Sequence, residues 1–352
     1  QAVFIGTLFH FSCIHCSINF TSVKYFITHL PAKSVLEILH KSINKLPWFA
    51  TKNTLKINHF RLTSLSESQN TRNFLVIKLF NIAVQIKNSL LTLMTQTIVI
   101  SVDKDEKYQG INLDLIILNS NFYNFHTNKN GGVIFLHATK VLLVQANITI
   151  NGCIFSNNSA YAGGVFYIKG NNYISYNSHV VNVYVMNCTF KNNLATTLGG
   201  AIYTGKRIHL TILQSIFINT NVVPETQVRG LFLASDGTVI LLNIALKLRD
   251  QGLAKSTVYI TPDAEGKIQS RFDIIHQCPK WHFGNIVKNY NNHSGLVSFA
   301  SSCKRCSYRM YSLISNKFSV LYQYGINIDM KLTDTNRAVY QKNSGNCLKY
   351  PH

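Results

Sequence analysis

The chain has 352 residues, enough for one elongated domain or two compact ones, and 46% of them are hydrophobic, which excludes a largely disordered chain. Charged residues are only 14% of the chain, against an ordinary share of about 25%, and Asn, Ser and Thr fill the polar positions, which favours strands and turns over surface helices. The formal net charge of +20 arises from scattered bases and scarce acids, a pattern that argues against specific nucleic-acid binding and fits a general attraction to acidic glycans or anionic surfaces.

Residues 1–110 contain strand-like runs without a regular repeat, and Cys16-Ser-Ile-Asn-Phe20 has the form of a decayed copy of the repeat described below. Residues 32–46 contain the one short helix that the sequence predicts, because apolar residues recur at helical spacing and Pro47 follows. The apolar face of this helix consists of Val35, Leu36, Leu39 and Ile43. We expect irregular β-helix coils here, interrupted by an inserted loop or by this helix.

The most apolar stretch of the chain is Leu90–Val102. It is interrupted by Thr and Gln and is shorter than the roughly 20 residues of a membrane-spanning helix, so we interpret it as one or two buried strands and expect no membrane span. The acidic cluster that follows contains Asp103, Asp105 and Glu106. It is typical of a solvated turn, and a catalytic or calcium site is the alternative.

Residues 111–275 contain four tandem copies of a motif in which a Phe is followed by Asn and then by a glycine pair. The Phe residues are Phe122, Phe155, Phe190 and Phe217, at successive spacings of 33, 35 and 27 residues. The glycine pairs begin 9, 8, 9 and 12 residues after each Phe, and in the degenerate fourth copy Arg229-Gly230 replaces the pair. Such periodicity is typical of a repeat architecture.

Each copy also carries aliphatic and β-branched runs bounded by Asn and Gly, which predict strands. These runs are Val141–Ile150, Val180–Met186, Ile208–Phe217 and Thr238–Ala245. A repeat this short buries its apolar face only by stacking on its neighbours, about 4.8 Å apart. We therefore predict a parallel β-helix in which the four Phe stack inward, the Asn residues turn a corner and the glycines permit a tight turn. Tandem helical repeats are excluded because the i, i+3, i+4 pattern is missing.

The repeat resembles those of the polymorphic outer-membrane proteins of chlamydiae, and it is similar to right-handed, pectin-lyase-like β-helix repeats in extracellular proteins of animals and protists. The residues that carry the resemblance are Phe155, Asn158, Gly163, Gly164, Phe190, Asn193, Gly199 and Gly200. The resemblance implies an all-β, right-handed parallel β-helix that is displayed on a surface, and it implies no reaction.

Residues 276–352 have a different composition, and we expect a small cysteine-rich segment there. Cys278-Pro279, the Cys303-x-x-Cys306 pair and Tyr311 are similar to the cysteine-rich module that follows such repeats in invertebrate and protist extracellular proteins. Arg309 stands where that module has Gly, and Tyr350 stands where it has the Cys before Pro. The module is therefore incomplete, either by divergence or by truncation.

Cys153 and Cys188 each precede a repeat Phe by two residues, so a β-helix places them on adjacent coils within the Cα range of a disulfide. A disulfide and two buried thiols acting as small hydrophobic groups remain equal alternatives.

The other cysteines fall at the two ends of the chain. Four of them, Cys278, Cys303, Cys306 and Cys347, allow three disulfide pairings. A zinc site is the alternative, although no second Cys-x-x-Cys or His pair completes it. Cys13-x-x-Cys16 lacks the βαβ context of a redox motif.

Five Asn-x-Ser/Thr sequons are candidates for N-glycosylation, at Asn19, Asn147, Asn157, Asn187 and Asn292. Together with the cysteine-rich end they favour an extracellular or cell-surface location. The chain begins with Gln1 and ends at His352, and we infer that it is a fragment of a larger protein.

The sequence indicates no catalytic, cofactor-binding or metal-binding residues. His137, His209 and His276 stand singly, and the repeats contain almost no acids, whereas glycoside hydrolysis usually requires two facing carboxylates. We therefore predict a non-catalytic scaffold for adhesion, surface display or ligand binding, monomeric and with an extracellular protein or glycan as ligand. A polysaccharide lyase or hydrolase on the same β-helix is the alternative, and both rest on analogy of fold.

Overall fold

A computed structural model describes most of the strand-forming parts of the chain. The described residues are 9–13, 17–21, 24–27, 36–40, 53–64, 73–78, 81–92, 96–101, 111–137, 143–169, 180–205, 208–218, 220–222, 233–235, 238–247, 255–260, 268–277, 282–291, 296–305, 310–311, 317–326, 339–341 and 348–349. These residues form strands and turns and no helix, and none of them belongs to a helix long and apolar enough to cross a membrane.

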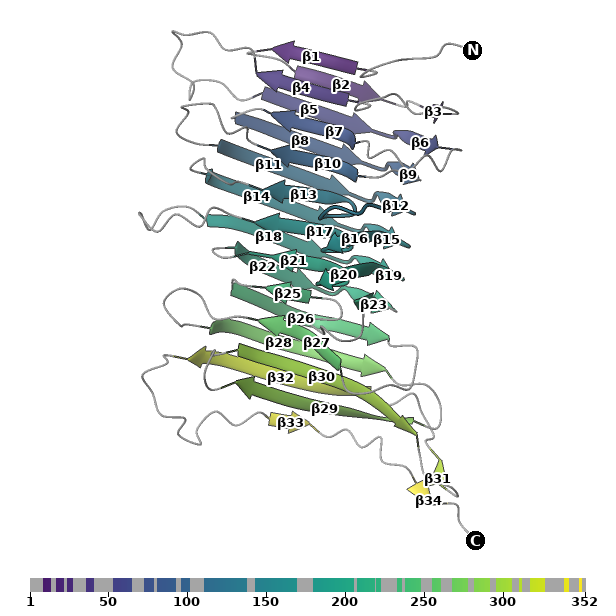
Figure 1. Ribbon diagram of the computed structural model, residues 1–352, viewed down its shortest axis with the longest axis vertical. Helices are drawn as coiled ribbons and strands as arrows, with labels where there is room; N and C mark the ends of the chain where they lie inside the picture. Colours follow the sequence, from purple (N-terminus) through teal and green to yellow (C-terminus); the bar gives the residue numbers. More distant parts are fainter. Residues whose placement is uncertain are drawn as a thin grey trace.

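The protein is an all-β solenoid in which successive coils of the chain stack in parallel along one long axis (Figure 1). One sheet, here called sheet A, has the spatial order β1 (Phe9–Cys13), β4 (Leu36–His40), β7 (Asn73–Lys78), β10 (Gln96–Ser101), β13 (Ile134–His137), β17 (Phe166–Lys169), β21 (Ile202–Thr204), β25 (Leu233–Ser235), β27 (Lys255–Ile260), β30 (Leu296–Arg305) and β29 (His282–Asn291).

The second sheet, sheet B, consists of two ladders side by side. Its long strands are β2 (Ser17–Thr21), β5 (Asn53–Asn58), β8 (Asn81–Lys87), β11 (Ile111–Leu118), β14 (Leu143–Asn151), β18 (Val180–Met186), β22 (Ile208–Leu213), β26 (Thr238–Lys247), β28 (Ile268–Gln277), β32 (Lys317–Ile326) and β33 (Val339–Gln341). Its short strands are β3 (Lys24–Ile27), β6 (Arg61–Ser64), β9 (Leu90–Thr92), β12 (Asn121–Tyr123), β15 (Ile154–Ser156), β19 (Thr189–Lys191) and β23 (Ile216–Ile218).

Two small sheets complete the structure. Sheet C contains β16 (Ser159–Ala162), β20 (Leu194–Leu198) and β24 (Asn221–Val222), and the last sheet pairs β31 (Met310–Tyr311) with β34 (Leu348–Lys349).

A central coil shows how the sequence produces this shape. Residues 143–169 run along β14, turn at Gly152, continue as β15, turn at Asn157 into β16, and turn again at Gly163 into β17. From Ala146 to Asn151, the side chains of β14 alternate between the interior and the outer surface, as the period of two along a strand requires. The parallel register matches each coil to the next, as Phe122, Phe155 and Phe190 show.

The core is a continuous column of aliphatic and aromatic side chains that runs along the axis. Ile148, Ile150 and their register partners Val183 and Val185 are fully buried. Because a coil contacts only its two neighbours, burial of this column depends on stacking. The all-β parallel solenoid predicted from the sequence is confirmed, and its right-handed winding stays a prediction.

The predicted helix in residues 32–46 is wrong where the structure describes it. Leu36–His40 forms β4, with β1 on one side and β7 on the other. In that register, Leu36 and Ile38 pair with Leu75 and Ile77. The hydrogen bonds and apolar neighbours of two flanking strands outweigh the helical spacing of the apolar residues, because tertiary pairing overrides a weak local propensity.

The C-terminal part of the stack changes direction in a way that the sequence did not predict. β28 pairs with β26 in parallel but with β32 in antiparallel fashion, and β30 is antiparallel to both β27 and β29. Long antiparallel strands thus extend both sheets where we expected a small cysteine-rich segment. Cys303 lies in β30, whereas Cys278, Cys306 and Cys347 fall outside the described residues.

Candidate binding surface

The repeat phenylalanines form one stack inside the solenoid. Phe122 and Phe155 have ring centroids 5.1 Å apart, Phe155 and Phe190 are also 5.1 Å apart, and Phe190 and Phe217 are 4.6 Å apart. Phe166 meets Phe155 edge-on at 4.9 Å. Stacked and edge-on aromatic pairs are favourable beyond their burial, so these rings stabilise the alignment of successive coils.

In six coils, a residue with a positive φ forms the corner between a long and a short strand of sheet B. These residues are His59, Asn88, Asn119, Gly152, Asn187 and Gln214, and Asn243 has the same conformation inside β26. Gly and Asn tolerate this left-handed conformation best, which explains their predominance. At the next corner, Asn124, Asn157 and Asn192 have positive φ, and the exposed Asn192 donates to the Oδ1 of Asn157 at 3.1 Å.

The asparagine that follows this second corner points inward and is buried. The Oδ1 of Asn158 accepts the backbone N–H of Phe125 at 3.1 Å, and its Nδ2 donates to the Oδ1 of Asn193 at 2.9 Å and to the carbonyl of Phe122 at 3.4 Å. Asn193 repeats the pattern by donating to the carbonyl of Phe155 at 3.0 Å. The two asparagines therefore satisfy buried backbone groups of the preceding coil.

The two glycines of each pair have different roles. Gly163 and Gly199 have φ values of +62° and +58°, where an L side chain is strained. At Gly164 a Cβ would overlap the carbonyl oxygens of Gly200 and Leu194. The second glycine is therefore required for the close approach of neighbouring coils.

Cys153 and Cys188 are free, buried thiols on adjacent coils. Each thiol donates to the carbonyl two residues earlier, at 3.4 Å and 3.0 Å. Ser120 and Ser215 occupy the same position in neighbouring coils and donate in the same way at 2.8 Å. The hydrogen bond to Cys153 and burial raise the pKa of the Cys188 thiol. Cys153 and Cys188 thus occupy, in their coils, the hydrogen-bonding position that Ser120 and Ser215 occupy in neighbouring coils.

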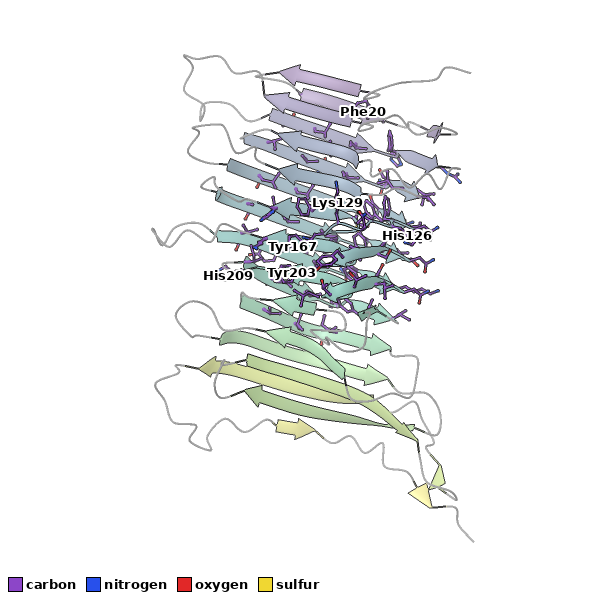
Figure 2. All side chains as sticks on the ribbon, in the orientation of Figure 1. Phe20, His126, Lys129, Tyr167, Tyr203 and His209 are labelled. Carbon is purple, nitrogen blue, oxygen red and sulfur yellow. The ribbon has the colours of Figure 1, made fainter. Side chains whose placement is uncertain are left out.

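Three aromatic rings form a second stack on the outer face of sheet A. Phe135 and Tyr167 are 5.6 Å apart and Tyr167 and Tyr203 4.9 Å apart, and Figure 2 shows the two tyrosines one above the other. Their ring faces contact each other, and Ala162 packs against them. Beside them, burial and the nearby charge of a lysine lower the pKa of His137.

The outer face of sheet B carries polar and apolar side chains and differs from coil to coil. Asn182 donates to the Oδ1 of Asn147 at 3.2 Å, and Asn147 donates to the carboxylate of Asp114 at 3.2 Å. The next residue in this row is His209, which is exposed. In the neighbouring row Tyr184 is 42% exposed. Amides, a carboxylate and an open aromatic ring can bind polar ligands, and we therefore consider this face the candidate binding surface.

The other residues singled out from the sequence are dispersed. The sequons at Asn19, Asn157 and Asn187 are exposed, and Asn292 lies outside the described residues. Asn147 lies on the outer face of sheet B, where it is hydrogen-bonded to Asp114 and Asn182. Also outside them are Cys16, Asp103, Asp105, Glu106, Arg229 and Gly230. Cys13 and His276 lie in β1 and β28, respectively. Among the described residues, no three His, Cys, Asp or Glu side chains gather as metal ligands would.

Comparison with known families matches residues 187–205 to the Chlamydia polymorphic membrane protein repeat. The matched segment begins at the Asn187 corner and includes Phe190, Asn193 and the pair Gly199-Gly200. No curated protein and no solved structure matches the chain. The resemblance inferred from the sequence is thus confirmed over part of one coil of the solenoid, from the Asn187 corner to Gly205, the residue after β21.

Proposed function

We propose that this chain is a non-catalytic scaffold, located outside the cell or on its surface, that binds ligands or surfaces along the flank of the solenoid. The observation that carries the proposal is that the residues of the repeat and the outward residues of sheet B have different roles. The side chains of the repeat are occupied in building the coil, as Phe190 and Asn193 illustrate, whereas the outward residues of sheet B change from coil to coil.

The matched repeat supports a surface location, because the repeat belongs to a family of membrane proteins, the Chlamydia polymorphic membrane proteins. The candidate sequons at Asn157 and Asn187 are exposed at corners, where attached glycans would face solvent. We propose adhesion and ligand binding from these observations. Polysaccharide cleavage is the competing activity, and the experiment below tests both.

The test uses the purified chain in two assays. The first measures binding of the fluorescently labelled chain to cultured cells, and we expect saturable binding that the unlabelled chain displaces. The second incubates the chain with pectin, alginate and xylan and measures new reducing ends and unsaturated uronates. We expect no release above a heat-treated sample, whereas release proportional to the amount of chain would overturn the non-catalytic proposal. Binding that does not saturate would contradict the adhesive one.

A further inference from the structure

We propose that one corner of sheet B, close to the N-terminal end of the described stack, binds an acidic polysaccharide. The corner contains Lys56 on β5, Arg61 on β6 and Lys87 on β8 (Figure 1), and we call these three residues the basic corner. This inference rests on the proposed function and names the chemistry of its ligand.

The register places the three cations on two neighbouring coils. Asn58 pairs with Lys87, so Lys56 lies one strand and two residues away from Lys87. With strands about 4.8 Å apart and about 3.3 Å per residue, the two Cα atoms are about 8 Å apart. Arg61 follows the same corner and pairs with Leu90, three residues after Lys87. The cations thus form a spread row, which suits a polymer of repeated charges better than a single small anion.

These positive charges are not neutralised within the described part of the chain. Lys56 and Arg61 are exposed, and Lys87 is partly exposed. No ion pair joins any of the three to a described residue. Among the described carboxylates of sheet B, the one on the coil next to Lys87 is Asp114, which pairs in register with Ala83, four residues before Lys87. Asp114 already accepts a hydrogen bond from Asn147. A polyanion is the partner that complements such a surface.

The neighbouring side chains favour a saccharide over other polyanions. Three amide side chains lie beside the cations: Gln85 pairs in register with Lys56, Asn58 pairs with Lys87, and Asn88 follows Lys87 at the corner. Their amides can bond sugar hydroxyl groups while the cations bind sulfate or carboxylate. Nucleic-acid strands are usually held by stacking on aromatic rings, and lipid surfaces by inserted apolar side chains. The exposed large hydrophobic residues of the described chain are Ile154, Tyr161 and Tyr184, and these lie on other coils.

The test measures binding of the full chain to heparin, polygalacturonate and neutral dextran by surface plasmon resonance at several salt concentrations. We expect binding to at least one acidic polysaccharide, weakening as salt rises, and none to dextran. The variant K56Q/R61Q/K87Q is expected to bind at least about tenfold more weakly, from three lost charge contacts.

The matched control is K129Q/K169Q/K191Q, which removes the same charge from other coils and is expected to bind within about twofold of the original chain. Equal weakening in both variants would mean a diffuse attraction to net charge and would overturn the proposed site. Tighter binding of single-stranded DNA or of phosphatidylserine vesicles through the same corner would overturn the choice of ligand.

The cell-binding assay separates this inference from the proposed function. Saturable cell binding that survives in K56Q/R61Q/K87Q, without any binding to acidic polysaccharides, would refute the inference and leave the scaffold role intact. Absence of saturable cell binding in the original chain would refute the scaffold role itself. Far-UV circular dichroism of both variants checks that the fold is retained, as expected for exposed side chains.

Discussion

Replacing Asn158 with leucine is expected to lower the free energy of unfolding by about 2–3 kcal/mol. The substitution leaves the N–H of Phe125 and the carbonyl of Phe122 without the partners that they have now. Each buried group without a partner costs about 1–3 kcal/mol, and the leucine side chain regains about 1.5 kcal/mol of apolar burial. Asn193 keeps the backbone N–H of residue 158 as a donor, so the damage falls mainly on the preceding coil.

The matched control is Asn157→Gly, at the neighbouring exposed corner. Asn157 has a φ of +57°, which glycine adopts without strain, and the lost contact is the exposed hydrogen bond from Asn192. We expect a change of about 0.5 kcal/mol or less.

Urea denaturation followed by far-UV circular dichroism measures both variants, and amide hydrogen exchange locates the damage, which we expect in β12 and β15. If Asn158→Leu lowers the free energy of unfolding by no more than Asn157→Gly does, the role assigned to the buried asparagines is refuted.

Three further predictions concern other parts of the coil. Gly164→Ala is expected to cost more than about 3 kcal/mol, because the new Cβ would overlap the carbonyl of Gly200, and a soluble variant with unchanged urea midpoint would contradict this. Cys153→Ser is expected to change stability by less than about 1 kcal/mol, because serine fills this position in other coils; a large loss in urea denaturation would show that the sulfur itself is needed. Burial and Lys169 lower the pKa of His137 in the folded state, so the unfolded state binds the proton first and stability falls as the pH drops below about 6.5. His137→Gln is expected to reduce this loss, and an unchanged pH profile of the melting temperature would contradict it.

The fold was predictable from residues whose positions admit few alternatives. Phe190 and its counterparts recur because a stack needs one ring per coil, and Gly164 recurs because a backbone oxygen occupies the space of its Cβ. Because only one residue type meets each requirement, that residue type recurs at regular spacing and can be recognised in a single sequence. The sequence also predicted that the Asn residues after each Phe turn a corner, as Asn157 does, but it did not predict that Asn158 points inward.

Other features were not predictable because several residue types satisfy them. The residue after the first corner can be Ser120 or Cys153, since either donates one hydrogen bond in a small space. The signal is a Gly, Asn or Gln followed by Ser or Cys, as in Gln214-Ser215, and it is visible only once the coils are aligned. The strand at Leu36–His40 was missed because its neighbours in the sheet lie far away in the sequence.

The candidate surface was the least predictable part, and the geometry of the coil explains why. The two coils that begin at Gly152 and Asn187 have almost the same spacing from this corner to the end of the following sheet A strand. Their lengths differ mainly in the number of residues between that strand and the next long strand of sheet B. Stacking constrains the inward residues and the corners, whereas outward strand positions need only be compatible with a strand. The repeat therefore predicts where a surface lies but not what it binds. The binding preference depends on residues outside the motif, and Lys56, Arg61 and Lys87 are of this kind.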